Sequence, residues 1–330
     1  MGTLLEVVDL KKYFPVRRGV VGYFKEKPRY VPAVDDVSFK VEEGETIALV
    51  GESGSGKTTL GRLILRLIEP TSGKILFEGK DITSLKGKEL KDVRRKMQIV
   101  FQDPYGALSP RQTVRKAMEE PLIIHNLYEP EEREEIIAKM LRAVGLNPPE
   151  FFMNKYPHEL SGGQRQRVCI ARALILNPKF MVMDEPVSLL DATVRVQILK
   201  LINEVKDKLN LTYIFITHDV ALGRYVSNKM IVLYQGRIME AGDTESLINN
   251  PMHPYTKTLI SAVPVPDPEV KLSIPPKAAE IEGTLITSEG CRFHPRCPYA
   301  TQKCRVEVPP LELVDDRMVA CWNYRSVKSA

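Results

Sequence analysis

The stretch "TIALVGESGSGKTT", residues 46 to 59, decides the fold of this chain. Its first part, "TIALVG", is a continuous apolar run, which is typical of a parallel strand buried on both faces. The remainder matches the phosphate-loop pattern G-x-x-x-x-G-K-[ST], and a helix is expected from about Lys57 to Ile68. A strand, a glycine-rich loop and a helix in this order predict an α/β protein that binds a nucleotide.

The residues of this loop have a defined chemistry. Gly51, Gly54 and Gly56 let the backbone curl so that its N–H groups point inward at phosphate oxygens. Lys57 is placed to reach the β- and γ-phosphates, and the Thr58 hydroxyl is placed to bind Mg²⁺. A glycine-rich turn without a ligand is the alternative, and the flanking strand and helix argue against it. The predicted nucleotide contacts are Gly51, Glu52, Ser53, Gly54, Ser55, Gly56, Lys57, Thr58 and Thr59.

Length and composition indicate an ordinary globular protein. A chain of 330 residues predicts about two domains, or one large α/β domain with an appendage. The net charge of +5 is too small to favour a nucleic-acid partner, and none is expected. The sequence has neither an apolar run of about 18 residues nor the start of a signal peptide, so we expect a soluble cytoplasmic chain. In that reducing compartment, clustered cysteines favour a metal site over disulfides.

The pattern along the chain predicts two parts. Residues 103 to 178 are helical and amphipathic, which indicates a helical insert. Buried strands resume at "KFMVMDEP" and "TYIFITHD", with a helix from about 193 to 209 between them, as in a doubly wound sheet. From about 250 onward prolines break any regular element. We therefore expect a nucleotide-binding domain at residues 1–250 and a loop-rich extension at residues 251–330.

Two adjacent carboxylates end the predicted strand in "FMVMDEP", residues 180 to 186. Asp184 suits a role in holding Mg²⁺, and Glu185 is placed to act as general base on the attacking water. The alternative is a pair that caps a helix at the end of a strand. The apolar run before them and the phosphate loop upstream favour the catalytic interpretation.

A second phosphate-binding device stands in "ELSGGQRQRVCIARALILNP", residues 159 to 178. Ser161, Gly162 and Gly163 precede a long helix, so a hydroxyl and bare backbone amides lie at its positive end. One γ-phosphate scarcely needs two such cradles from one chain. A two-fold arrangement, in which each subunit closes its second cradle on the partner's nucleotide, explains both.

These motifs carry a resemblance to a known family. "LSGGQ" resembles the signature of ABC-type ATPases, and the family's other motifs follow in order. Gln102 in "VFQDP" resembles the Q-loop glutamine, and His218 in "FITHD" resembles the switch histidine. "SLLD", residues 188 to 191, resembles the D-loop, with Leu189 where alanine is usual and Asp191 in place.

The resemblance covers about residues 4 to 250 and implies fold and activity. The implied fold is a RecA-like core with an antiparallel β subdomain and a helical subdomain, here followed by a small irregular Cys-rich tail. ATP would lie between Gly51 to Thr58 of one subunit and Ser161 to Gln164 of the other, and its hydrolysis would reopen the pair. An aromatic side chain should stack on adenine, for which Phe14 is favoured and Tyr13 is the alternative. The implied Mg²⁺ ligands are Thr58, Gln102 and Asp184.

Two further stretches narrow the resemblance. "NPMHPYTKTLISAVPVPDP", residues 250 to 268, and "VRRGVVGYFKEKPRYV" near the start are similar to segments of oligopeptide and dipeptide importer ATPases, in particular the F-type subunit. The implied partners are a homologous D-type ATPase or a second copy, two transmembrane permease subunits and, indirectly, an extracytoplasmic solute-binding protein. The implied location is the cytoplasmic face of the membrane.

Other functions stay open at this point. Related importers carry oligosaccharides or nickel, and soluble ABC ATPases act on nucleic acid or in iron–sulfur assembly. A phosphate-loop kinase for a small molecule would have no use for "LSGGQ".

Four of the five cysteines lie close together near the carboxyl end, spaced Cys291-x5-Cys297-x6-Cys304-x16-Cys321. Four thiolates can enclose zinc or an iron–sulfur cluster, and the C-x₂-C pairs favoured by zinc ribbons are missing. Resemblance to the peptide-importer subunits implies a 4Fe–4S cluster, with zinc and free or disulfide-bonded cysteines as alternatives. His294 is a possible substitute ligand, whereas the fifth cysteine, Cys169, is expected to pack in a helix.

Overall fold

The computed structural model describes residues 2–16, 30–263 and 289–328. Most of the early insertion and the proline-rich stretch at residues 264–288 therefore lie outside the described residues. Contacts divide the chain into two compact units. We name them the helical unit (Met1–Gly2, Glu42–Glu45 and Ser84–Phe215) and the P-loop unit (Thr3–Val41, Thr46–Thr83 and Ile216–Ala330).

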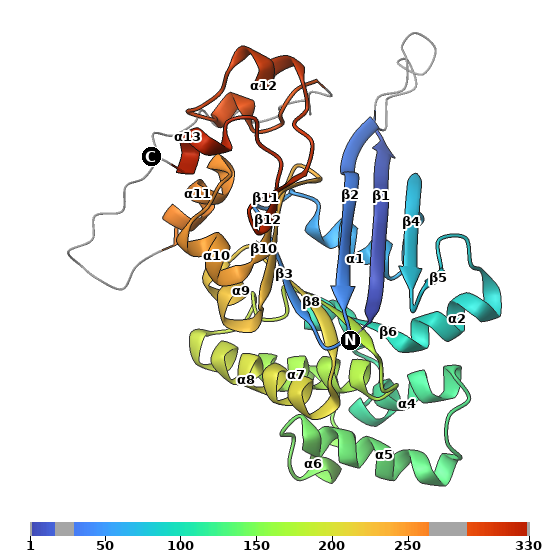
Figure 1. The fold of residues 1–330 in the computed structure, drawn as a ribbon. Helices are drawn as coiled ribbons and strands as arrows, with labels where there is room; N and C mark the ends of the chain where they lie inside the picture. Colours follow the sequence, from blue (N-terminus) through green and yellow to red (C-terminus); the bar gives the residue numbers. More distant parts are fainter. Residues whose placement is uncertain (1, 17–29, 264–288, 329–330) are drawn as a thin grey trace, which may run out of the picture. The chain divides into compact units, whose positions relative to one another are not determined.

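An antiparallel sheet forms the first layer of the P-loop unit, and its strands run side by side in Figure 1. Leu5 and Val7 of β1 are buried while Glu6 between them is half-buried, as the two-residue period of a strand requires. This sheet is the antiparallel β subdomain that the resemblance predicts. Its strands, in spatial order, are β2 (Tyr30–Glu42), β1 (Thr3–Pro15), β4 (Ser72–Phe77) and β5 (Lys80–Asp81).

A second sheet of the P-loop unit carries the phosphate loop. Its strand β3 (Thr46–Val50) is buried throughout and pairs in parallel with β9 (Lys229–Tyr234), as predicted for a buried strand. Beyond β9 the sheet continues antiparallel through β10, β12 and β11. The tail was expected to be irregular, yet it supplies two of these strands. The bounds are β10 (Arg237–Asp243), β11 (Glu312–Val314) and β12 (Arg317–Val319).

Helix α1 (Lys57–Ile64) follows the phosphate loop, and it ends four residues earlier than predicted. Arg66 has a left-handed backbone (φ 53°), which stops the helix at this point. The other helices of this unit are α9 (Val220–Val226), α10 (Thr244–Asn249), α11 (Pro254–Ser261), α12 (Gln302–Val306) and α13 (Tyr324–Lys328).

The helical unit contains parallel strands β6 (Met97–Val100) and β7 (Phe180–Asp184) and the first part of β8 (Thr212–Thr217). Helices fill the segment predicted as a helical insert, and α4 and α5 pack against each other and against α6 and α7. Their bounds are α2 (Gly87–Lys96), α3 (Pro104–Ala107), α4 (Val114–Ile124), α5 (Pro130–Ala143), α6 (Pro149–Met153), α7 (Gly162–Leu174) and α8 (Ala192–Leu209).

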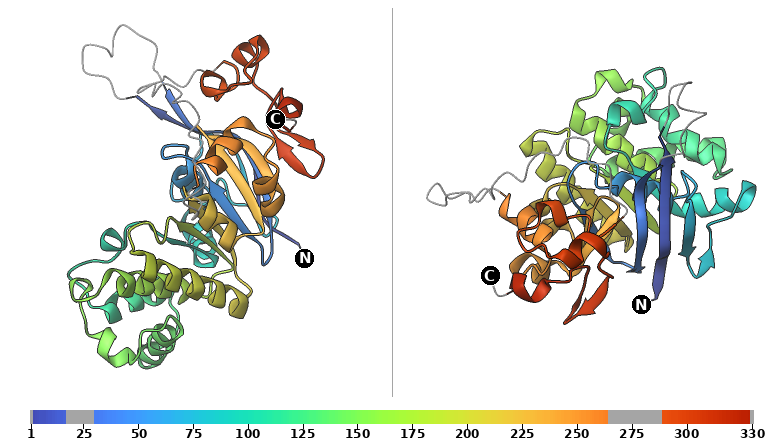
Figure 2. Two further views of the ribbon diagram at one scale, coloured as in Figure 1. Left: turned by 90° about the vertical axis from the view of Figure 1, so that its left-hand side faces the viewer. Right: turned by 90° about the horizontal axis from the view of Figure 1, so that it is seen from above.

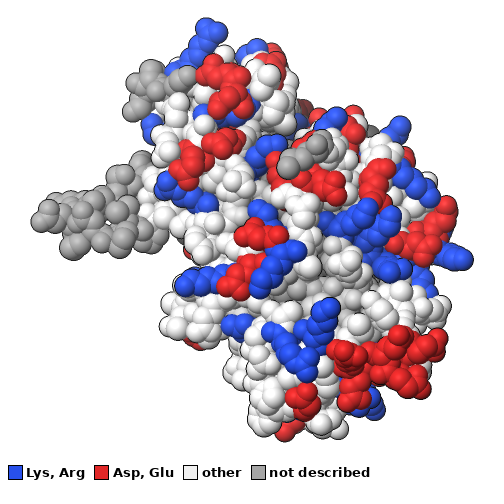
Figure 3. Space-filling model, turned by 60° about the horizontal axis from the view of Figure 1, so that its bottom comes forward, with Lys and Arg blue, Asp and Glu red and all other residues white. Residues whose placement is uncertain are grey.

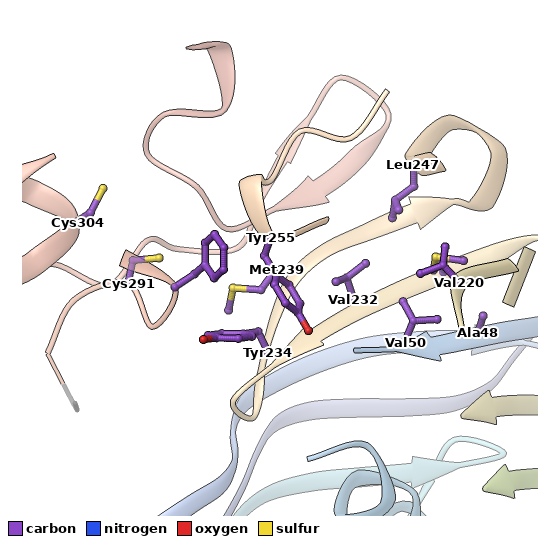
Figure 4. Close-up of a cluster of buried hydrophobic side chains, with 12 residues drawn as sticks. Ala48, Val50, Val220, Val232, Tyr234, Met239, Leu247, Tyr255, Cys291 and Cys304 are labelled. Atoms are coloured by element: carbon purple, nitrogen blue, oxygen red, sulfur yellow. The ribbon is translucent and has the colours of Figure 1, made fainter. Parts of the chain in front are cut away.

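The apolar core of the P-loop unit joins the phosphate-loop strand to the tail (Figure 4). The rings of Tyr234, Tyr255 and Phe293 lie 4.5 to 5.4 Å apart, centroid to centroid, and close the core on one side. Figure 2 shows the red tail segments beside the orange helices α10 and α11. The members are Ala48, Val50, Val220, Met230, Val232, Tyr234, Met239, Leu247, Tyr255, Cys291, Phe293 and Cys304.

Acidic and basic side chains are interspersed on the face drawn in Figure 3. This mixture agrees with the small net charge of +5. Among the helices that the structure describes, none has the length and apolar character that a membrane crossing needs.

Candidate active site

The phosphate loop lies between β3 and α1 and is held close to neighbouring backbone. A Cβ atom on Gly51 would stand 2.2 Å from the Leu233 carbonyl oxygen, and one on Gly56 would stand 2.2 Å from the Ala33 oxygen. Both glycines also have positive φ angles, 155° and 102°. Only glycine therefore fits at either position, because any side chain would clash with neighbouring backbone and would disfavour these φ angles.

Lys57 places its ammonium group inside this curl. The side chain is buried, and its Nζ donates to Gly51 O at 2.7 Å, to Glu52 O at 2.8 Å and to Ser55 Oγ at 3.4 Å. These three oxygens hold the cation within the loop, where a lysine is suited to bind the phosphates of a nucleotide. Thr58 follows in the first turn of α1, where a Mg²⁺ ligand is predicted.

The two aromatic candidates for adenine stacking differ in their surroundings. The Tyr13 hydroxyl donates to Asp35 Oδ1 at 2.5 Å, and burial together with this bond raises the pKa of Tyr13 to about 12. Phe14 instead is 40% exposed, with Lys12 Nζ 5.1 Å from the centre of its ring. Because the Tyr13 ring is held by Asp35, the open ring of Phe14 remains the predicted stacking partner.

The strand-end carboxylates take up different environments in the helical unit. Asp184 is buried as the last residue of β7. Glu185, the next residue, has a left-handed backbone (φ 46°), a conformation that is unfavourable for any residue with a side chain. Gln102 Nε2 donates to Glu185 Oε2 at 3.1 Å, so the structure brings together the predicted Q-loop glutamine and the predicted general base.

The signature segment forms the start of α7. Ser161 Oγ accepts from Gln164 N at 3.3 Å, and Gln164 Oε1 accepts from Ser161 N at 3.0 Å, which makes a capping box. A Cβ atom on Gly163 would stand 2.5 Å from Val194 Cγ1 of α8. Glycine at position 163 therefore lets α7 and α8 pack closely, and it would also let a phosphate approach the backbone. Asp191 caps α8 by accepting from Val194 N at 3.0 Å.

The predicted site residues belong to both units. The P-loop unit holds Tyr13, Phe14, the loop Gly51 to Thr59 and His218, which is exposed between β8 and α9. The helical unit holds Gln102, Ser161, Gly162, Gly163, Gln164, Asp184, Glu185 and Asp191.

Comparison with known proteins identifies the family of this chain. The family model "ABC transporter" matches residues 34–188, and the model "Oligopeptide/dipeptide transporter, C-terminal region" matches residues 239–304. The oligopeptide transport ATP-binding protein AppF of Bacillus subtilis is 45% identical over 328 residues, which are 98% of this chain and 98% of AppF. This chain belongs to the ATP-binding subunits of oligopeptide and dipeptide ABC transporters.

A second relative and a solved structure support the same family. The dipeptide transport ATP-binding protein DppF of Haemophilus influenzae is 44% identical over 97% of this chain and 96% of its own. A solved dimeric structure of the ATP-binding cassette MJ0796, bound to ADP and Pi, has a TM-score of 0.63 at 30% identity and covers 73% of this chain and 99% of that one. The ABC ATPase fold is thereby confirmed, and this ATP-binding subunit hydrolyses ATP to drive transport.

Sequence reasoning missed two residues that contact the phosphate loop of this ATP-binding subunit. Tyr255, in "HPYT", accepts a hydrogen bond from Glu52 N at 2.8 Å. Arg296, in "FHPRC", donates to both carboxylate oxygens of Glu52 at 2.8 Å each. The repeated His-Pro followed by a large polar residue was visible in the sequence, but no local pattern indicated what it would touch.

The cysteine cluster of the ATP-binding subunit is only partly as predicted. Cys291, Cys297, Cys304 and Cys321 line one small pocket, together with His294. However, within the described ranges no group of three or more His, Cys, Asp or Glu side chains is arranged to hold a metal ion. The structure therefore gives no support to the predicted 4Fe–4S cluster or to the zinc alternative. Cys291 and Cys304 instead pack as apolar members of the core.

Burial also affects the protonation of these thiols. Burial raises the pKa of Cys297 to about 11 and that of Cys321 to about 12, so both are neutral thiols near pH 7. His294 Nδ1 lies 2.8 Å from Cys291 O and is engaged with backbone. Cys169 is buried in α7, and burial raises its pKa to about 11, as expected for a packed residue.

Proposed function

We propose that this ATP-binding subunit powers the import of dipeptides or oligopeptides. The observation that carries the proposal is the full-length match to AppF, 45% identical over 98% of both chains, because it includes the C-terminal region as well as the cassette. The chain would work at the cytoplasmic face of the membrane with two transmembrane permease subunits and, indirectly, an extracytoplasmic solute-binding protein. Its ATPase partner would be a D-type homologue or a second copy of itself.

The chain's own residues account for the chemistry of hydrolysis. Lys57 and the loop amides would bind the β- and γ-phosphates, and Thr58 and Asp184, with Gln102, would hold Mg²⁺. The oxygen of a water molecule attacks the γ-phosphorus, the bond to the bridging β,γ-oxygen breaks, and ADP and phosphate form. Glu185 accepts the proton of that water. The Gln102 amide, 3.1 Å from the carboxylate, keeps the base oriented.

Uptake by whole cells tests the substrate class. A strain lacking this subunit should lose import of labelled dipeptides and tetrapeptides, and the parental gene should restore it. Restoration with Lys57→Ala should fail, because removing the loop cation weakens nucleotide binding. Unchanged peptide uptake in the deleted strain, with loss of nickel or oligosaccharide uptake instead, would assign the chain to another branch of the family.

We also propose that the four tail cysteines bind a 4Fe–4S cluster. The support is that all four line one pocket and that each sulfur has a hydrogen-bond donor beside it. Backbone N–H groups of Phe293, Tyr299 and Asn323 donate to three of the sulfurs. Thr301 Oγ1 lies 3.3 Å from the fourth sulfur, that of Cys304. Such donors stabilise thiolates and tune the potential of iron–sulfur clusters.

Anaerobic purification tests this cluster. We expect broad visible absorbance with about four iron and four sulfide per chain, lost in Cys297→Ser and kept in Cys169→Ser. Because binding needs thiolates, the iron content should fall as the pH is lowered. Colourless protein with one zinc per chain, or with no metal at all, would refute the cluster.

A further inference from the structure

The second residue of the phosphate loop, Glu52, is held from outside the cassette at two points. Its backbone N–H donates to the Tyr255 hydroxyl at 2.8 Å, and its carboxylate accepts two bonds of 2.8 Å from the Arg296 guanidinium. Both partners lie in the C-terminal extension, and Arg296 is 244 residues from Glu52 in sequence. All three residues belong to the P-loop unit. We name Tyr255 and Arg296 the P-loop clamp.

Tyr255 is fixed in its place by the structure around it. The side chain is fully buried and packs its ring against Tyr234, with centroids 4.5 Å apart. His253 caps α11 by accepting from Tyr255 N at 3.0 Å, and burial lowers the pKa of His253 to about 3, which keeps that nitrogen an acceptor. Glu240 accepts from His253 N at 2.9 Å and so anchors the start of the helix. The hydroxyl therefore meets Glu52 from a rigid support.

Arg296 approaches from the cysteine loop. It ends the short helix His294–Arg296, between Cys291 and Cys297. Its guanidinium carbon lies 5.6 Å from the centre of the Phe293 ring, which restricts its position. A two-point bond between a guanidinium and a carboxylate is geometrically specific and stronger than a single surface contact. The side chains are half-buried, with exposures of 29% for Arg296 and 39% for Glu52, so water screens the pair only in part.

Glu52 transmits this restraint to the phosphate-binding groups. Its carbonyl oxygen accepts from Lys57 Nζ at 2.8 Å and from Ser55 N at 3.2 Å. A loop with glycines at 51, 54 and 56 has many accessible backbone conformations when it is not restrained. Restraint in the binding conformation lowers the entropy lost when a ligand binds.

We propose that Tyr255 and Arg296 are positioning residues for ATP, which hold Glu52 so that the phosphate loop is preformed before the nucleotide arrives. The clamp acts on the loop in the ground state and in the transition state alike. Its loss should therefore raise KM for ATP and leave kcat nearly unchanged, the pattern of lost uniform binding. The proposal needs ATP hydrolysis but does not depend on which solute is transported.

Steady-state ATPase kinetics of the full transporter complex test the clamp. Tyr255→Phe removes one neutral hydrogen bond and Arg296→Gln removes the two-point charged contact, and we expect each to raise KM for ATP by about threefold to tenfold. Arg296→Lys should recover part of the loss, because it keeps the charge without the two-point geometry. The matched control is Arg305→Gln, an exposed arginine of α12 in the same module, which should keep the parental KM.

A double-mutant cycle distinguishes an effect of Arg296 through Glu52 from a general loss of structure in the tail. If Arg296 acts through Glu52, Glu52→Gln and the double variant should raise KM no further than Arg296→Gln alone. The fluorescence of Trp322, which lines the cysteine pocket, should stay parental in each variant and so show that the tail is folded. Parental KM in both Arg296→Gln and Tyr255→Phe, or additive effects in the cycle, would overturn the proposal.

Discussion

Glu185→Gln should lower ATP hydrolysis by about 10²- to 10⁴-fold while ATP still binds. The amide has the shape of the carboxylate, so it can still accept from Gln102 Nε2, which lies 3.1 Å from Glu185 Oε2. It cannot accept the proton of the attacking water at neutral pH. Because the cradle for the phosphates remains, ATP-bound dimers should accumulate, and size-exclusion chromatography with ATP would detect them.

The control for this variant is Glu204→Gln, an exposed carboxylate of α8 in the same unit, which should turn over at the parental rate. Hydrolysis by Glu185→Gln at that rate would show that another group serves as the base. Loss of ATP binding in the same variant would mean that the substitution disturbs the site as a whole.

Glu240→Ala should lower the free energy of unfolding of the P-loop unit by about 2 to 5 kcal/mol, because each buried N–H group left without an acceptor costs about 1 to 3 kcal/mol. Glu240 is fully buried and accepts from Met252 N at 3.0 Å and His253 N at 2.9 Å. Arg317 lies 3.5 Å away, and its side chain is 5% exposed. The substitution would leave two buried backbone N–H groups without acceptors and would remove one of the two carboxylates beside Arg317, which keeps Asp316 at 3.2 Å.

Urea unfolding followed by the fluorescence of Trp322, the only tryptophan of the chain, measures this loss. The control is Glu312→Ala on β11, where the carboxylate is exposed and the change should stay within about 0.5 kcal/mol. An unfolding midpoint for Glu240→Ala equal to that of the control would show that Glu240 does not stabilise the "HPYT" segment.

Local motifs explain why much of the site could be predicted. The phosphate loop and the signature each depend on glycines and on a helix start a few residues away, so their conformations follow from short stretches of sequence. The pair Asp184 and Glu185 likewise follows from one buried strand. Gln102 was assigned to the site from the resemblance to a family. No local pattern predicts its contact with Glu185, because the two residues are 83 positions apart.

The contacts of the tail could not be predicted for a related reason. The pairing of β12 with β10 and the contact of Arg296 with Glu52 join segments distant in sequence. By local rules "HPYT" is a loop that enters a short helix, and the buried hydroxyl of Tyr255 has no periodic signal. The cysteines were assigned to a metal site from their spacing and from the resemblance, and neither shows that Cys291 and Cys304 also fill the core.

The core shared by β3 and the tail has a consequence for how the chain matures on the ribosome. Synthesis runs from the amino end, so β3 and the phosphate loop emerge long before Tyr255, Phe293 and Cys304, which cover them. Contacts of such long sequence separation form late and slow the folding of the whole unit. Until Tyr255, Phe293 and Cys304 have been made, apolar side chains such as Val232 and Tyr234 lack their cover and are open to aggregation. A chain that stops before Arg296 would lack half of the P-loop clamp, so its phosphate loop would bind ATP more weakly.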